Sequence, residues 1–85
     1  MIIKLTQRAE KDLKKLSSEI RDRVFEKFEE IEKHPHPLNL AKKIHSCTKG
    51  TFRFRVANDY RIIFRIVHEE IIIARIGHRK NIYKF

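Results

Sequence analysis

The stretch FRFRVANDYRIIFR, residues 52–65, decides the fold because apolar and basic side chains alternate along it. A period of two is typical of strands with one buried face, and the break in the middle indicates a hairpin. A two-residue turn would place Arg55 opposite Ile62, whereas a three-residue loop at 57–59 places Arg55 opposite Arg61. Only the second register separates charge from core. The stretch therefore predicts an antiparallel hairpin with a three-residue loop.

This register sorts the side chains onto two faces of a sheet. A third β-branched run follows at 71–76, and both connections are too short for a parallel crossover, so we expect an antiparallel meander. A three-residue loop at 68–70 would direct Ile72, Ala74 and Ile76 into the core. The hairpin itself directs four large side chains there: Phe52, Phe54, Ile62 and Phe64. The opposite face gathers five arginines: Arg53, Arg55, Arg61, Arg65 and Arg75.

The first part of the chain has helical periodicity instead. A short apolar run at 2–5 is expected to form a first strand. It precedes Thr6, whose hydroxyl can cap a helix, and Asp12 falls on the polar side of that helix. A second helix runs to about Lys33, where His-Pro-His-Pro ends it, and Phe25 extends its buried stripe. A short extended piece is expected in the connector that follows. We therefore expect an α+β fold in which two helices cover one face of the sheet.

The composition of the 85 residues predicts one domain, 1–85, and a polyanionic partner. There are 20 Lys+Arg against 11 Asp+Glu, a formal net charge of +9, which favours nucleic acid, an acidic membrane or an acidic protein. The longest apolar run, 71–74, is too short to span a bilayer, so no membrane partner is expected. Cys47 is the only cysteine and cannot form an intrachain disulfide. These features predict a cytoplasmic protein.

The basic face is the first candidate for a binding site. Like charges opposite each other destabilise a sheet, so an anionic ligand is expected there, and arginine binds phosphate well. The alternative is a solvated face whose arginine stems cover apolar neighbours such as Ile63. The tail GHRKNIYKF, 77–85, either frays or is tied down by residues such as Ile82 beside this face. If it is tied down, it adds His78, Arg79, Lys80 and Tyr83.

A metal site is the second candidate, and the spacing argues against it. Imidazole and thiolate are common zinc ligands, but the available residues lie in a Pro-containing connector without a paired CxxC half. These residues are His34, His36, His45 and Cys47. We expect no metal and no cofactor. Cys47 also lacks an evident partner base that would make it a nucleophile.

Three motifs in this order resemble the RelE/ParE toxin superfamily of bacterial and archaeal toxin–antitoxin systems. They are FRFRV at 52–56, YRIIF at 60–64 and GHRKNIY at 77–83, preceded by a KxLxxL-type first helix. The resemblance implies two helices packed on a twisted antiparallel sheet of about four strands. It implies an activity like that of RelE-like members, which enter the A site of the 30S ribosome and cut mRNA. It also implies a cognate antitoxin that wraps the toxin.

The resemblance further implies a mechanism and a set of site residues. The ribose 2′-OH attacks the adjacent phosphate, which gives a 2′,3′-cyclic phosphate and a 5′-OH without metal. The catalytic set would be Arg53, Arg55, Arg61, Arg79 and Tyr83. The further RNA-binding set would be Arg65, Arg75, His78 and Lys80. Arg61 would hold the scissile phosphate, Arg79 the leaving oxygen and Tyr83 a nucleotide, with both arginines on the open face.

Two questions stay open at this point. Arg53 and Arg55 stand where better-studied members carry lysine, and arginine cannot act as a base, which leaves His78 and His45 as candidates. ParE-like members poison DNA gyrase without nuclease chemistry, and a catalytically silent RNA-binding module is a third possibility. In each toxin reading, an acidic, partly disordered antitoxin is expected to cover the apolar seam near Leu13 and Leu16.

Overall fold

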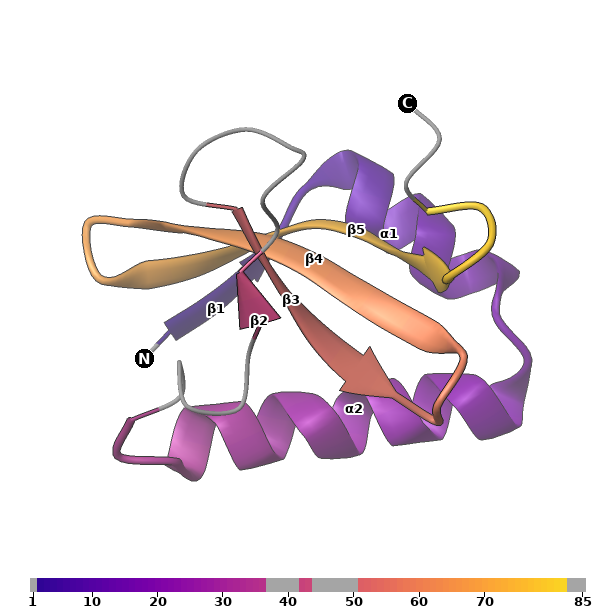
Figure 1. Cartoon of the computed structure of the whole chain (residues 1–85), viewed down its shortest axis with the longest axis horizontal. Helices are drawn as coiled ribbons and strands as arrows, with labels where there is room; N and C mark the ends of the chain where they lie inside the picture. The colour runs from indigo at the N-terminus through magenta and orange to yellow at the C-terminus, as the bar shows by residue number, and fades with distance from the viewer. Residues whose placement is uncertain (1, 37–41, 44–50, 83–85) are drawn as a thin grey trace.

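The computed structural model describes residues 2–36, 42–43 and 51–82. These residues form one sheet with two helices against it (Figure 1). The elements in chain order are β1 (Ile2–Leu5), α1 (Gln7–Lys15), α2 (Ser18–Lys33), β2 (Lys42–Lys43), β3 (Thr51–Val56), β4 (Tyr60–Val67) and β5 (Glu70–His78). Within the described ranges, neither helix is long and apolar enough to cross a membrane.

The predicted α+β fold is confirmed, but one edge of the sheet is formed by a parallel strand pair. The strand order is β1-β5-β4-β3-β2, and β1 pairs with β5 in parallel while the other pairs are antiparallel. The sheet is therefore mixed, instead of the antiparallel sheet that was predicted. The extended piece expected in the connector is present as β2, which pairs with the start of β3. Residues 37–41 and 44–50 of that connector lie outside the described residues.

The first hairpin has the predicted register. Arg55 pairs with Arg61, and the loop between β3 and β4 is the three residues 57–59. Ala57 and Asn58 adopt left-handed backbone conformations, with φ of 49° and 61°. The turn is thus built by two residues at positive φ. Arg55 and Arg61 therefore lie directly opposite each other on adjacent strands.

The second hairpin is tighter than predicted. Val67 pairs with Glu70, so the turn is the two residues His68 and Glu69, both at positive φ. This geometry matches the right-handed twist of the flanking strands. The three-residue loop predicted at 68–70 is therefore wrong.

A β-bulge in β5 then changes which residues face the core. Ile63 of β4 pairs with Arg75, but the next residue, Phe64, pairs with Ile73, so Ala74 is the extra residue. The buried residues of β5 are Ile71, Ile73 and Ile76, instead of the predicted Ile72, Ala74 and Ile76. The shorter turn shifts the alternation of core-facing and outward-facing residues by one position, so that Ile71 and Ile73 face the core. The bulge at Ala74 shifts it back, so that Arg75 faces outward and Ile76 faces the core. Only Ile76 was correct.

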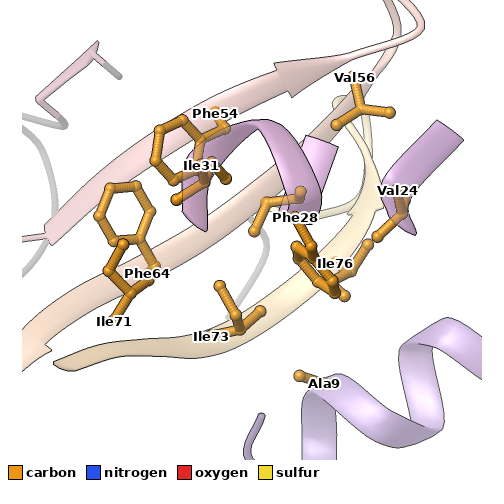
Figure 2. Close-up of a cluster of buried hydrophobic side chains, with 11 residues drawn as sticks. Ala9, Val24, Phe28, Ile31, Phe54, Val56, Phe64, Ile71, Ile73 and Ile76 are labelled. Atoms are coloured by element: carbon orange, nitrogen blue, oxygen red, sulfur yellow. The ribbon is translucent and has the colours of Figure 1, made fainter. Parts of the chain in front are cut away.

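The core lies between the sheet and the helices (Figure 2). Phe54 and Phe64 stack with ring centroids 4.3 Å apart. The α2 stripe consists of Val24, Phe28 and Ile31, all buried. Phe25 does not belong to it, because its side chain is 45% exposed and meets Phe28 edge-on at the rim. Sequence periodicity placed Phe25 next to the buried stripe, but only the side of α2 that carries Val24, Phe28 and Ile31 is buried.

The start of α1 is tied directly to β5. The Thr6 hydroxyl accepts a hydrogen bond from the backbone N–H of Ala9 (3.1 Å), which confirms the predicted cap. The same hydroxyl donates to the carbonyl of Ile73 (3.0 Å). The cap therefore also fixes where α1 begins relative to β5.

Asp12 of α1 is buried, although it was expected on the polar side of the helix. Its side chain is 8% exposed, and Oδ2 accepts hydrogen bonds from the backbone N–H of Ile76 (3.0 Å) and from Nε of Arg75 (2.9 Å). The pairing of β1 with β5 ends at Ile73, so the edge of β5 beyond it faces α1. A carboxylate on α1 satisfies the backbone donor at that edge.

Candidate nucleic-acid interface

The face of the sheet opposite the core carries the arginines at the predicted register. Arg55 and Arg61 are a direct pair, and Ile63 beside them pairs with Arg53 on one side and Arg75 on the other. Ile63 is only 3% exposed, which agrees with arginine stems and neighbouring chain covering it. The face is therefore basic at its rim and apolar at its centre.

The segment after β5 folds back onto this face. The carbonyl of His78 accepts hydrogen bonds from the backbone N–H groups of Asn81 (2.9 Å) and Ile82 (3.0 Å). Ile82 is 1% exposed, and the face of Gly77 that lacks a side chain looks directly onto it. The tail is tied down at Ile82, as one of the two sequence interpretations required. This turn brings Arg79 and Lys80 to the rim of the basic face.

An open hollow of about 390 Å³ lies at this end of the face, lined by Arg53, Arg61, Arg79 and Lys80. Three of these residues belong to the predicted catalytic set, and Lys80 belongs to the predicted RNA-binding set. These four lining residues of the described part of the chain are cations from β3, β4 and the turn after β5. We call this feature the arginine hollow.

Arg61 is the most enclosed member of the arginine hollow. It is 8% exposed, and its Nη1 donates to the carbonyls of Asn58 (2.7 Å) and Tyr60 (2.9 Å). The expectation that Arg61 lies on the open face holds for its strand position and is wrong for its guanidinium. The turn carbonyls hold the guanidinium against the sheet, so its direction is set before any ligand arrives.

Arg79 stands at the rim and is anchored to the first hairpin. Its backbone N–H donates to the carbonyl of Asp59 (2.7 Å), and its Nε lies 3.2 Å from Asp59 Oδ1. Both side chains are about half exposed. Asp59 was absent from the residues that sequence reasoning selected. A signal existed, because Asp59 is the only acidic residue between Glu32 and Glu69.

Arg55 is not part of the arginine hollow. It lines a separate hollow of about 180 Å³ against α2, whose lining includes Glu26 and Glu30. Among the described residues, β2 pairs with β3 at Phe52 and Arg53, and the hollow at Arg55 lies between β3 and α2. The carboxylates of the helix thus offer this arginine an alternative partner to RNA.

Two further arginines lie away from the arginine hollow. Arg75 belongs to the outer face by register, but its Nε is bonded to Asp12 of α1. Arg65 is exposed and pairs with Thr51, at the opposite end of the β3 and β4 pair from Arg61. Neither residue lines the arginine hollow among the described residues.

His78 lies on the helix side of the sheet. It pairs with Tyr60, a residue that packs against the core, and the two rings meet edge-on with centroids 5.3 Å apart. Its Nδ1 accepts a hydrogen bond from the backbone N–H of Lys80 (3.1 Å). The side chain lines a third hollow, of about 340 Å³, together with residues of α1 that include Arg8 and Lys15. By strand register, His78 therefore belongs to the helix side of the sheet, and it is not among the described residues that line the arginine hollow.

The remaining sequence candidates give no site in the described part of the chain. Tyr83, His45 and Cys47 lie outside the described residues. His34 Nδ1 accepts the backbone N–H of His36 (2.9 Å), a local turn contact. No group of three or more His, Cys, Asp or Glu side chains with metal-binding geometry occurs among residues 2–36, 42–43 and 51–82.

The arginine hollow can bind phosphate and stabilise negative charge. Guanidinium groups form paired hydrogen bonds to phosphate oxygens, and Arg61 is already oriented by its carbonyl partners. Charge that develops in a pentavalent phosphorane is stabilised most by groups that need no reorganisation. Arginine does not give up its proton, so Arg53, Arg61 and Arg79 act as charge and hydrogen-bond donors only.

Three comparisons place this chain among known proteins. A sequence family described as the ParE toxin of type II toxin-antitoxin system, parDE, matches residues 3–83. Toxin RelG of Mycobacterium tuberculosis is 33% identical, over 96% of this chain and 94% of that protein. The RelB-RelE antitoxin-toxin complex from Methanococcus jannaschii contains a chain that is 34% identical, with a TM-score of 0.75 over 93% of each chain. The RelBE2 toxin-antitoxin complex from M. tuberculosis gives 32% identity and a TM-score of 0.72, over 92% of this chain and 96% of that one.

Proposed function

Because this chain belongs to the RelE/ParE superfamily of toxins from type II toxin–antitoxin systems, we propose that it is an endoribonuclease that cuts mRNA in the ribosomal A site. The observation that carries this proposal is the arginine hollow. Its lining consists of Arg53, Arg61, Arg79 and Lys80, which together suit one phosphodiester of an extended RNA strand.

The proposed reaction is an internal transfer of the phosphoryl group. The ribose O2′ forms a bond to phosphorus while the bond from phosphorus to O5′ breaks. The proton of the 2′-OH is released, and a proton is taken up by the leaving O5′. The products are a 2′,3′-cyclic phosphate and a 5′-OH. No metal ion is needed in this scheme, because guanidinium groups supply the positive charge.

The roles follow from how each arginine is held. Arg61 has its guanidinium fixed by two turn carbonyls, which suits it to hold the non-bridging oxygens of the scissile phosphate. Arg79 stands at the rim on a turn and suits the leaving oxygen. Arg53 adds charge from the neighbouring strand, and Lys80 binds the flanking backbone. Tyr83 follows this turn in the sequence and is proposed to stack on a nucleotide.

We predict that cleavage requires the ribosome. Among residues 2–36, 42–43 and 51–82, those that line the arginine hollow include neither histidine nor carboxylate, so we expect the ribosome to supply the substrate geometry. Ordering the reacting groups is worth roughly 7–11 kcal/mol in favourable cases. Primer extension on an mRNA incubated with the purified chain, with and without programmed ribosomes, measures this. Efficient cutting of the same mRNA without ribosomes would contradict the prediction.

Inhibition of DNA gyrase is the second candidate, and one observation favours it. The family that matches residues 3–83 is named for the ParE toxin. A supercoiling assay with purified gyrase, run beside the primer extension, separates the two functions. Loss of supercoiling without mRNA cleavage would replace the proposed function, and RNA binding with neither effect would indicate a catalytically silent module.

We propose a cognate acidic antitoxin as the protein partner. Two structurally similar relatives were solved as complexes with an antitoxin. On this chain, Leu13 and Leu16 remain only partly buried, and the hollow beside them is lined by Arg8 and Lys15. An amphipathic acidic segment would find an apolar seam and positive charge together at this place.

Association with that antitoxin should be fast and weakened by salt. The chain carries a net charge of +9, so attraction between opposite charges speeds the encounter, and salt screens it. Dissociation should depend on the apolar seam instead. Stopped-flow binding at low and high ionic strength tests both statements, and Leu16→Ala should raise the dissociation rate more than Arg8→Ala does. An association rate that is indifferent to salt would reject the electrostatic part.

A further inference from the structure

The turn between β3 and β4 holds two arginines of the arginine hollow at once. The carbonyls of Asn58 and Tyr60 accept hydrogen bonds from Nη1 of Arg61, at 2.7 and 2.9 Å. The carbonyl of Asp59, between them, accepts the backbone N–H of Arg79 at 2.7 Å. Three successive carbonyls thus fix one guanidinium and the backbone of another arginine.

The Asp59 side chain adds a contact that the turn itself does not need. The positive φ angles that shape the turn belong to Ala57 and Asn58, and the backbone N–H of Asp59 donates to the Ala57 carbonyl at 2.6 Å. Backbone groups of any residue could make these bonds. The carboxylate instead lies 3.2 Å from Nε of Arg79. A turn-forming role alone therefore does not account for it.

A carboxylate is an unfavourable choice beside a hollow that binds a polyanion. Asp59 is the only acid in a stretch of sequence that otherwise carries positive charge, from Lys33 to His68. It lies next to Arg79, whose long side chain is 53% exposed and would otherwise sample many rotamers. Its negative charge repels phosphate, so we expect the carboxylate to have another effect that outweighs this repulsion. That effect is the restriction of Arg79.

We infer that Asp59 is a positioning residue that holds the Arg79 guanidinium at the rim of the arginine hollow. Contact at Nε leaves the two terminal Nη groups directed to a second anion, and arginine can satisfy both because its donors form a rigid fork. The inference rests on the proposed function, since it assigns Asp59 to the same reaction. Asp59 orients the group that contacts the leaving oxygen and does not contact RNA itself.

The first test compares two variants that remove one negative charge each. Asp59→Asn keeps the size of the side chain and the backbone bond to Arg79, and it is expected to slow cleavage on programmed ribosomes by on the order of 10- to 100-fold. The loss should appear in kcat with little change in KM, because the orientation of Arg79 is lost while every cation that binds the RNA backbone is kept. Asp22→Asn, at an exposed position of α2, raises the net charge equally and should cut like wild type.

Coupling to Arg79 separates positioning from a general structural effect. In an Arg79→Ala background, Asp59→Asn should produce no further loss, because its only target is gone. Cleavage by Asp59→Asn at the wild-type rate would overturn the inference. An equal loss in both backgrounds would also overturn it.

A second measurement does not depend on cleavage. In a ¹⁵N spectrum of the arginine Nε–Hε groups, the Arg79 signal is identified by its absence in Arg79→Ala. In the wild-type chain this signal should stand apart from those of solvated arginines, and in Asp59→Asn it should merge with them. An Arg79 signal unchanged by Asp59→Asn would overturn the inference. If wild type does not cut mRNA, the proposed function fails, and the spectrum then decides the Asp59–Arg79 contact on its own.

Discussion

Arg61→Ala is expected to lower the rate of mRNA cleavage on programmed ribosomes by about 10²–10³-fold. The guanidinium is directed by two turn carbonyls, and removing one such preorganised donor from a site of developing negative charge typically has this effect. The free energy of unfolding should also fall, by about 1–3 kcal/mol, because the two carbonyls lose their partner in a position that is 8% exposed. Rates of cleavage and urea unfolding curves measure the two effects separately.

Two controls keep these effects apart. Arg65→Ala removes the same charge from the same face, at an exposed position that does not line the arginine hollow, and should reduce cleavage much less. Arg61→Lys retains the charge but cannot bridge carbonyls and phosphate with a rigid fork, so it should stay folded and still cut slowly. Arg61→Ala protein that is folded and cuts within a few-fold of wild type would remove Arg61 from the site.

Asp12→Ala is expected to be the most destabilising charge removal among the described residues, at about 3–5 kcal/mol. Its carboxylate accepts the backbone N–H of Ile76 and Nε of Arg75, and both donors lose their partner when it is removed. Breaking a buried pair on one side leaves an uncompensated charge, which costs more than the pair contributes. Urea unfolding monitored by circular dichroism gives the value.

The matched control for Asp12 is Arg8→Ala on the same helix. Arg8 lies 3.9 Å from Asp12 but is 65% exposed, so its loss should change the free energy of unfolding by less than about 1 kcal/mol. Equal destabilisation by Asp12→Ala and Arg8→Ala would show that the contacts of Asp12 with Arg75 and Ile76 do not contribute to the free energy of unfolding. Asp12→Asn should fall between the two, since an amide oxygen can still accept from Ile76.

The first hairpin was predictable because, of the two loop lengths compared, only the three-residue loop separates its charges from its core. The two-residue turn would have placed Arg55 opposite Ile62, and the observed pairs agree with the three-residue prediction. β5 was less predictable, because Ile71, Ile72 and Ile73 are apolar on both faces and carry no alternation. A bulge at Ala74 then has no signature in the sequence. The core positions of β5 therefore follow from the pairing with β4 and β1.

The arginine hollow was predictable in part for a similar reason. Strand alternation and the tail motif indicated Arg53, Arg61, Arg79 and Lys80 together, and these four line it. Asp59 was missed because an acid in a turn has an ordinary local explanation. His78 was placed near the hollow by proximity in sequence, but the strand register turns it to the other face.

Local chemistry along the chain was enough to identify the helices, the cap at Thr6, the hairpin at 57–59 and the side of the sheet that carries positive charge. These features depend on the alternation and capping of neighbouring residues, so each can be recognised within the short segment of sequence that forms it. The partners of the long charged side chains depended on tertiary structure. Arg75 binds Asp12, 63 residues away, and Arg55 lines a hollow with Glu26 and Glu30 of α2, because folding brings helix carboxylates beside these strands. An extended guanidinium binds whichever acceptor the packed elements bring within reach, and only the packing of α1 and α2 against the sheet fixes which one that is.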